Sequence, residues 1–168
     1  MSQYRIAAVC LGNICRSPIA EAVLIDRLDS GGLGNLVTVD SAGTSNWHAG
    51  GDADPRTLAV LDRNDYSIDH TAKQFQRSHF ADRDLILAMD RSNLDDLRAI
   101  APDDAAIEKI RLLRSFDPGL MHLPEDDPEL DVPDPYSGGA DGFAEVLRMI
   151  EIASDGVIDF VRLELTRR

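Results

Sequence analysis

Near its N-terminus the chain reads Tyr4-Arg5-Ile6-Ala7-Ala8-Val9-Cys10-Leu11-Gly12-Asn13-Ile14-Cys15-Arg16-Ser17-Pro18. The first six residues form a short, mainly apolar run that is typical of a buried strand, and we expect the strand to end at Cys10. Ser17 and Pro18 mark the start of a helix, because serine is a common N-cap and proline suits the first helical position. The stretch therefore predicts a strand, a tight loop and a helix in direct succession.

The same alternation continues along the chain. Three further strands are predicted at 36–39, 85–89 and 109–113. Helices are predicted between and after them, with Asp54, Asp90 and Asp141 as N-caps and with Gly31-Gly32 and Pro102 as stop signals. This order predicts an α/β fold: a single domain over residues 1–168, with a four-stranded parallel sheet and helices on both faces. Such sheets bind their ligands at the carboxyl ends of the strands.

Composition and charge narrow the class of protein. With 43% hydrophobic and 28% charged residues, the chain is too apolar to be disordered as a whole. Its 17 basic and 30 acidic residues give a net charge of −13, which argues against nucleic acid or an anionic membrane surface as partner. Two cysteines, Cys10 and Cys15, make neither a disulfide framework nor a zinc site. Because neither a signal peptide nor a membrane span is apparent, we expect a cytoplasmic protein without metal or organic cofactor.

One acidic region stands apart from the rest of the sequence. Residues 115–147 contain no lysine or arginine, nine acidic residues and five of the eight prolines. A long connection of this kind is usually functional or disordered. For residues 125–131 we expect a solvated acidic linker.

The loop after the first strand is suited to bind a tetrahedral anion. Five residues between Cys10 and Arg16 suffice to curl the backbone so that its N–H groups point inward. Gly12 allows close approach and Asn13 tolerates a positive φ, while Arg16 supplies a planar fork of donors. The start of a helix and the arginine both favour the thiolate of Cys10. A thiolate inside a phosphate cradle suggests covalent phosphoryl transfer, whereas Gly-rich nucleotide-binding motifs are absent.

The nine residues from Cys10 to Pro18 resemble the signature loop of the low-molecular-weight protein tyrosine phosphatases. Asp134-Pro135-Tyr136 is similar to the general-acid motif of that family, and residues 40–44, 47, 54–56, 70–74 and 89–94 also occur in family order. The resemblance covers nearly the whole chain. It implies hydrolysis of phosphotyrosine in proteins through a cysteinyl-phosphate intermediate.

The resemblance also implies a role for each matching residue. Cys10 is expected to be the nucleophile and Asp134 the general acid and base. Phosphate is expected to bind to Arg16 and to the loop residues Leu11, Gly12, Asn13, Ile14, Cys15 and Ser17. Ser17 would also donate a hydrogen bond to the Cys10 sulfur. Trp47 and Tyr136 would form the walls of the cleft.

Supporting roles follow from the same resemblance. Asn13, Ser41 and His70 would brace the loop by hydrogen bonds. Asp90 would support the site, although its position also fits a helix cap. Cys15 would either form a reversible disulfide with Cys10 or be a small buried thiol.

Alternatives and departures remain. A cysteine-relay arsenate reductase needs further cysteines, and none follows Cys15. Protein arginine phosphatases carry threonine where this chain has Ile14, which favours the tyrosine phosphatase; a non-catalytic phosphotyrosine-binding module is the third reading.

Ser137 and Lys73 depart from common family residues, and the acidic stretch 119–133 should favour basic phosphopeptides. We expect phosphotyrosine proteins as partners, no nucleic acid, no membrane, and a monomer or weak dimer.

Overall fold

A computed structural model describes residues 3–168. The strands are β1 (Tyr4–Cys10), β2 (Val37–Gly43), β3 (Leu85–Ala88) and β4 (Ile110–Leu112). The helices are α1 (Arg16–Ser30), α2 (Pro55–Arg63), α3 (Arg91–Ile100), α4 (Asp104–Glu108) and α5 (Ala140–Thr166). Three 3-10 turns complete the set: η1 (Arg77–Asp82), η2 (Leu113–Phe116) and η3 (Pro128–Leu130). No helix within residues 3–168 is both long and apolar enough to cross a membrane.

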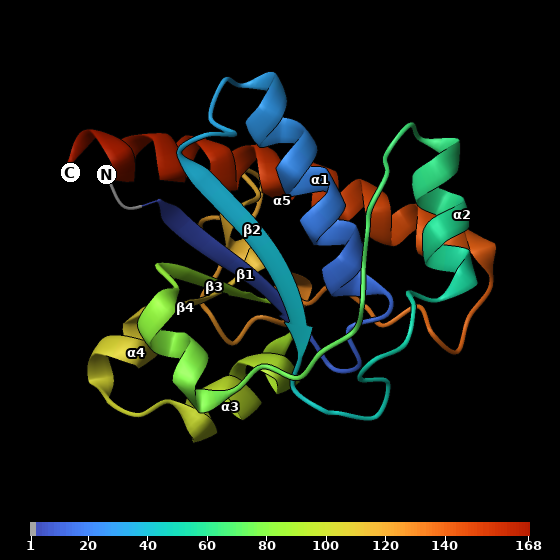
Figure 1. Cartoon of the computed structure of the whole chain (residues 1–168), viewed down its shortest axis with the longest axis horizontal. Helices are drawn as coiled ribbons and strands as arrows, with labels where there is room; N and C mark the ends of the chain where they lie inside the picture. The colour runs from blue at the N-terminus through green and yellow to red at the C-terminus, as the bar shows by residue number, and fades with distance from the viewer. Residues whose placement is uncertain (1–2) are drawn as a thin grey trace.

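The four strands form one parallel sheet in the order β2-β1-β3-β4 (Figure 1). In the register of this sheet Ile6 lies between Val39 and Leu85, and Cys10 lies opposite Gly43. The predicted α/β fold with four parallel strands is thereby confirmed. Because β1 is central, the loop that follows it opens at the middle of the carboxyl edge of the sheet.

Side chains of β1 alternate between two hydrophobic clusters, one on each face of the sheet. Ile6, Ala8 and Cys10 pack into the larger cluster, formed with α1, α2 and α5. Ala7 and Val9 pack into the smaller cluster, formed with α3, α4 and η1. Both faces of the strand are therefore buried, which explains the nearly continuous apolar run in its sequence.

Several predicted boundaries and caps are wrong. Strand β2 extends to Gly43 instead of Val39, because Asp40 is neutralised by Lys73 and Arg83 and so fits within a strand. The cap predicted at Ser17 is absent: α1 begins at Arg16, and the Ser17 hydroxyl is used by other partners.

At the C-terminal side, α5 begins at Ala140 after Gly139, so Asp141 lies in the first turn and is not the cap. Helix α4, with Asp103 as its cap, was not predicted, because five residues are too few for a periodic pattern. Asp54 and Asp90 do cap α2 and α3, as expected, through hydrogen bonds to Arg56 N and Asn93 N.

The stretch 125–131 is not a plain solvated linker. It contains η3, which is capped by Asp127, and Leu130 is buried in the smaller cluster. Asp131 accepts a hydrogen bond from the backbone of Arg91. The acidity of this segment suggested that it would be solvated. Burial of the Leu130 side chain and the local cap that Asp127 provides for η3 order it instead.

Candidate active site

The loop between β1 and α1 curls around the Cys10 side chain. Its turn is made by Asn13, whose φ of 59° lies in the left-handed region that asparagine tolerates. The Asn13 N–H donates a hydrogen bond to the Cys10 Sγ at 3.3 Å. In the part of the chain that the structure describes, the backbone N–H groups of Gly12, Ile14 and Cys15 have no acceptor. These donors are available to an oxyanion above the sulfur.

The Asn13 side chain fixes the shape of the loop. Its Nδ2 donates to the hydroxyls of Ser17 (2.8 Å) and Ser41 (3.0 Å), and its Oδ1 accepts from the N–H of Lys73 (3.0 Å). His70 Nε2 lies 2.7 Å from the Asn13 carbonyl oxygen. The network therefore joins the loop to α1, to β2 and to the segment before η1.

Ser17 lies behind the sulfur. Its Oγ is 3.0 Å from Cys10 Sγ and 3.3 Å from the carbonyl oxygen of Ala42. Ser17 is fully buried, so its hydroxyl does not open into the pocket. The hydroxyl is placed to donate to a thiolate, because a thiolate is an acceptor only.

Arg16 is 2% exposed, and its guanidinium is held on one side of the loop. Nη1 donates to Asp90 Oδ2 (2.5 Å) and to the Val132 carbonyl oxygen (3.0 Å). Burial alone would lower the pKa of Arg16, but the Cys10 sulfur and the Asp90 carboxylate raise it above its ordinary value. The arginine is therefore a permanent cation whose Nη2 edge faces the pocket and Asp134.

Asp134 lies at the mouth of the pocket. Its Oδ2 is 3.8 Å from Arg16 Nη2, its Oδ1 accepts from the Tyr136 N–H at 3.1 Å, and its side chain is 46% exposed. The carboxyl group therefore lies where it can contact both the pocket and solvent. Its position depends mainly on the backbone that carries it.

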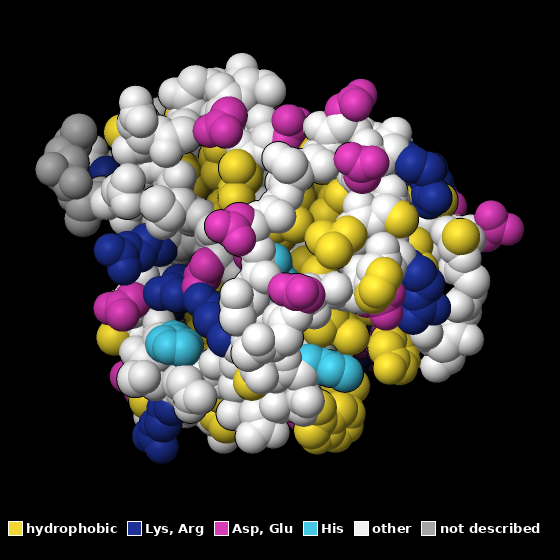
Figure 2. Space-filling view, turned by 45° about the vertical axis from the view of Figure 1, so that its right-hand side comes forward, with side chains coloured by type: hydrophobic (Ala, Val, Ile, Leu, Met, Phe, Trp, Pro, Cys, Tyr) yellow, Lys and Arg dark blue, Asp and Glu magenta, His cyan; other side chains and the backbone are white. Residues whose placement is uncertain are grey.

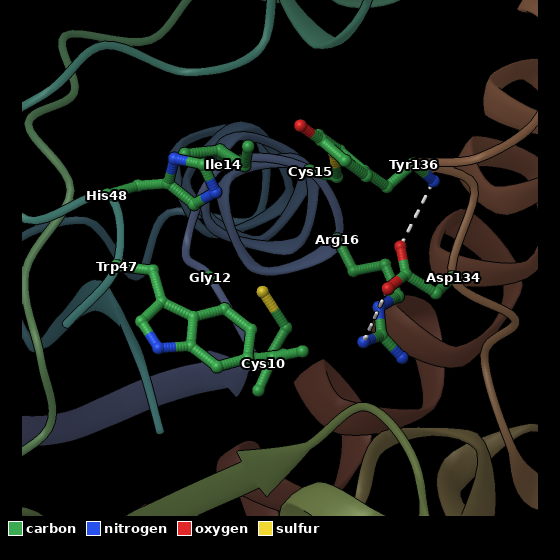
Figure 3. A pocket seen from close by; sticks show the side chains of 10 residues that line it. Cys10, Gly12, Ile14, Cys15, Arg16, Trp47, His48, Asp134 and Tyr136 are labelled. Atoms are coloured by element: carbon green, nitrogen blue, oxygen red, sulfur yellow. Dashed lines mark hydrogen bonds and ion pairs between the residues drawn. The ribbon is translucent and has the colours of Figure 1, made fainter. Parts of the chain in front are cut away.

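The pocket itself has a volume of about 100 Å³. Trp47 and His48 line one side of it, and Tyr136 and Asp134 line the other, with the Cys10 sulfur between them (Figure 3). It is lined by Cys10, Leu11, Gly12, Ile14, Cys15, Arg16, Trp47, His48, Asp134 and Tyr136. A small planar group attached to a tetrahedral anion suits this arrangement of aromatic walls and cationic floor.

Five of the residues selected from the sequence do not line the pocket. Asn13 and Ser17 lie beneath the loop, while Ser41 and His70 are hydrogen-bonded to Asn13. Asp90 contacts Arg16 and also caps α3, so both expected roles are compatible with its geometry.

Cys15 is a buried free thiol in the same loop. Burial and the nearby Asp54 carboxylate raise its pKa to about 12, so it is protonated at neutral pH. A protonated thiol is a poor nucleophile.

Sequence reasoning missed several residues around the site. The Glu21 carboxylate accepts from the Ser41 hydroxyl at 2.6 Å, and burial raises the pKa of Glu21. The Thr57 hydroxyl donates to the Ile14 carbonyl oxygen at 2.8 Å. Arg56 contacts the segment that carries Asp134. No local motif marks Glu21 or Thr57 in the sequence. Arg56 belongs to the segment 54–56, which occurs in family order, and this was the signal that could have found it.

Within residues 3–168, no cluster of three or more His, Cys, Asp or Glu side chains could hold a metal ion.

Comparisons with known proteins agree with this geometry. A family model described as low molecular weight phosphotyrosine protein phosphatase matches residues 5–167. A Streptomyces coelicolor protein named low molecular weight protein-tyrosine-phosphatase is 52% identical over 165 residues, which is 98% of each chain.

Solved structures of two phosphatases are also similar to this chain. The crystal structure of a protein tyrosine phosphatase from Entamoeba histolytica is 34% identical, with a TM-score of 0.87 over 99% of this chain and 100% of that one. A Drosophila arginine phosphatase is 30% identical, with a TM-score of 0.82 over 93% and 96% of the two chains.

Proposed function

Because this chain belongs to the low molecular weight phosphotyrosine protein phosphatase family, we propose that it hydrolyses phosphotyrosine in proteins through a cysteinyl-phosphate. One observation carries the mechanism. The Cys10 sulfur lies in a loop with free backbone donors, while the Arg16 guanidinium and the Asp134 carboxyl flank the same pocket.

In the first step the Cys10 thiolate attacks phosphorus in line with the departing phenol oxygen. An S–P bond forms and the P–O bond to the aryl group breaks, while Asp134 donates its proton to the leaving oxygen. Arg16 and the loop N–H groups stabilise the charge on the equatorial oxygens. The hydrogen bond from Ser17 stabilises the thiolate before attack and when the sulfur leaves again.

In the second step water attacks the phosphorus of the cysteinyl-phosphate. Asp134, now ionised, takes a proton from that water, and the S–P bond breaks to release inorganic phosphate and regenerate the thiolate. Trp47 and Tyr136 provide the aromatic walls between which the substrate ring lies.

We also propose a location and an assembly state. A cytoplasmic location is supported by the two free thiols, because the mechanism needs Cys10 reduced. All groups that act on the substrate come from one chain, so a monomer or weak dimer suffices. Reversible pairing of Cys10 with Cys15 is a further hypothesis, which the raised pKa of Cys15 would make slow.

Hydrolysis of p-nitrophenyl phosphate in the presence of EDTA tests the proposal. Wild type is expected to turn over, Cys10→Ser to have no activity, and Asp134→Ala to lose about 100-fold in kcat/KM, the scale of general acid catalysis. Asp126→Ala, which changes an exposed acid of the same acidic region, is the matched control and should behave as wild type. A wild type that binds phosphate without hydrolysing the ester would contradict the proposal.

Phosphoarginine is the second candidate substrate, because of the similarity to the Drosophila arginine phosphatase. Against it, the apolar Ile14 side chain lines the pocket. Comparing kcat/KM for phosphotyrosine and phosphoarginine peptides of the same sequence decides between them, and we expect phosphotyrosine to be favoured.

A further inference from the structure

Arg56, the second residue of α2, links two parts of the site that are distant in the sequence. Its Nη1 donates to the Gly138 carbonyl oxygen and its Nη2 to the Tyr136 carbonyl oxygen, both at 2.8 Å. The guanidinium also lies over the rings of Phe143 (4.6 Å) and Tyr136 (5.6 Å). One side chain therefore grips the backbone two and four residues after Asp134. We name residues 134–138 the acid loop.

The other side of the guanidinium is fixed by Asp54. Nε donates to Asp54 Oδ1 at 3.0 Å and Nη2 to Oδ2 at 2.9 Å, a bidentate pair that lowers the pKa of Asp54. The Asp54 N–H donates to the Ile14 carbonyl oxygen at 2.9 Å. The Asp54–Arg56 pair thus joins the phosphate loop to the acid loop.

No other side chain in residues 3–168 donates a hydrogen bond to the backbone of the acid loop. Among the described residues, the Asp134 carboxylate is held by two interactions: it lies 3.8 Å from Arg16 Nη2 and accepts a hydrogen bond from the Tyr136 N–H. Within the acid loop the Gly138 N–H donates to the Pro135 carbonyl oxygen, whereas the carbonyl oxygens of Tyr136 and Gly138 accept from Arg56. Arginine suits this task, since its planar fork serves several acceptors at once and the single ammonium of lysine does not.

We propose that Arg56 is a positioning residue for proton transfer: it sets the distance between the Asp134 carboxyl and the leaving oxygen by anchoring the acid loop to the phosphate loop. The inference rests on the proposed function and adds to it. Arg56 itself does not line the pocket, so its effect reaches the substrate only through Asp134 and Tyr136.

The test compares two aryl phosphates whose leaving groups differ in basicity. Phenyl phosphate needs a proton at its leaving oxygen far more than p-nitrophenyl phosphate does. Arg56→Met is expected to lose kcat/KM on both substrates, with a loss on phenyl phosphate about 10-fold greater than that on p-nitrophenyl phosphate, because a misplaced acid harms the more basic leaving group more. Inhibition by inorganic phosphate should stay within about 2-fold of wild type, because the phosphate loop is intact.

Two variants complete the design. Arg56→Lys keeps the charge and can serve one carbonyl, so its loss on phenyl phosphate is expected to be smaller than that of Arg56→Met. Arg148→Met is the matched control, because the ion pair of Arg148 is with Glu145 and not with the acid loop. Its kcat/KM on both substrates should equal that of wild type.

Equal losses on both substrates in Arg56→Met and Arg56→Lys would overturn the inference, and so would no loss on either. A failure of the proposed function would look different. In that case wild type itself would hydrolyse neither ester, and both proposals would fall together.

Discussion

At the scale of single residues, Asn13 performs the most tasks. Its backbone makes the left-handed turn of the phosphate loop, and its N–H points at the Cys10 sulfur. Its fully buried side chain makes hydrogen bonds to Ser17, Ser41 and the backbone of Lys73. Few other side chains combine tolerance of a positive φ with two donors and an acceptor on a short stem.

Substituting Asn13 separates its two tasks. Asn13→Ala removes the three hydrogen bonds and keeps a Cβ at positive φ, so we expect the free energy of unfolding to fall by about 3 kcal/mol. Asn13→Gly loses the same bonds without backbone strain and should be about 1 kcal/mol less destabilised. Urea unfolding measures both. If the alanine variant were as stable as the glycine variant, backbone strain would have no part.

At the scale of elements, two glycines permit close backbone approaches, one at the end of β2 and one within α5. A Cβ at Gly43, the last residue of β2, would lie 2.6 Å from the Leu11 carbonyl oxygen. A Cβ at Gly156, within α5, would overlap with the Phe116 carbonyl oxygen. The first contact belongs to the phosphate loop and the second to the larger hydrophobic cluster.

The two glycines make a matched pair. Gly43→Ala must displace the phosphate loop, so kcat/KM is expected to fall at least about 10-fold, as for a misplaced site of this kind. Gly156→Ala must displace α5 from η2, so the free energy of unfolding should fall by about 2 kcal/mol with kcat/KM within about 2-fold of wild type. Thermal unfolding and p-nitrophenyl phosphate kinetics measure both effects. Similar activity losses in the two variants would contradict this division.

At the scale of the whole molecule, acidic charge dominates. Figure 2 shows acidic side chains scattered over the visible face among other groups. The half-buried Asp40 is paired with two cations: it accepts from Arg83 and Lys73 at 2.6 Å each and so joins β2 to the chain on either side of η1.

The paired acids give stability a defined dependence on pH. Burial raises the pKa of Asp40, but the hydrogen bonds from Arg83 and Lys73 lower it below the ordinary 3.8. Since the folded value lies below the unfolded one, the stabilisation is fully present above about pH 5 and is lost as the pH falls below 4. Asp40→Asn is therefore expected to destabilise by about 1 to 2 kcal/mol at pH 7 and by progressively less as the pH falls through 3.8 towards the lower pKa of the folded state. A difference that stays constant across that range in urea unfolding would contradict the assignment.

The net charge of −13 also bears on substrate choice. An acidic enzyme repels acidic phosphopeptides and attracts basic ones, an effect that salt screens. At low salt we expect kcat/KM for a lysine-flanked phosphotyrosine peptide to exceed that for its glutamate-flanked counterpart by about 10-fold. The ratio of the two kcat/KM values should approach one at 1 M salt. Equal kcat/KM values for the two peptides at low salt would show that the net charge of the protein does not affect substrate choice.

Elements whose starts are marked by residues within a few positions were predicted correctly from the sequence. The apolar run before Cys10, the Asp54-Pro55 start of α2 and the Asp90 cap of α3 all depend on neighbours within a few residues. Elements that depend on distant partners were missed or misplaced. Strand β2 runs on through Asp40 only because Lys73 and Arg83 neutralise it, and Ser17 gives up its capping role to contact Cys10.

By itself, the sequence determined the parallel α/β fold and the loop from Cys10 to Ser17, because strand, turn and helix signals there are continuous along the chain. The role expected for Asp134 came from resemblance, since nothing local separates it from eight other acids between residues 115 and 147. Only the tertiary structure brought Asp134 to within 3.8 Å of Arg16 and placed Arg56 against the backbone that carries it. The physical reason is that these contacts join segments about 80 to 120 residues apart, and their geometry exists only once the sheet and α5 have packed.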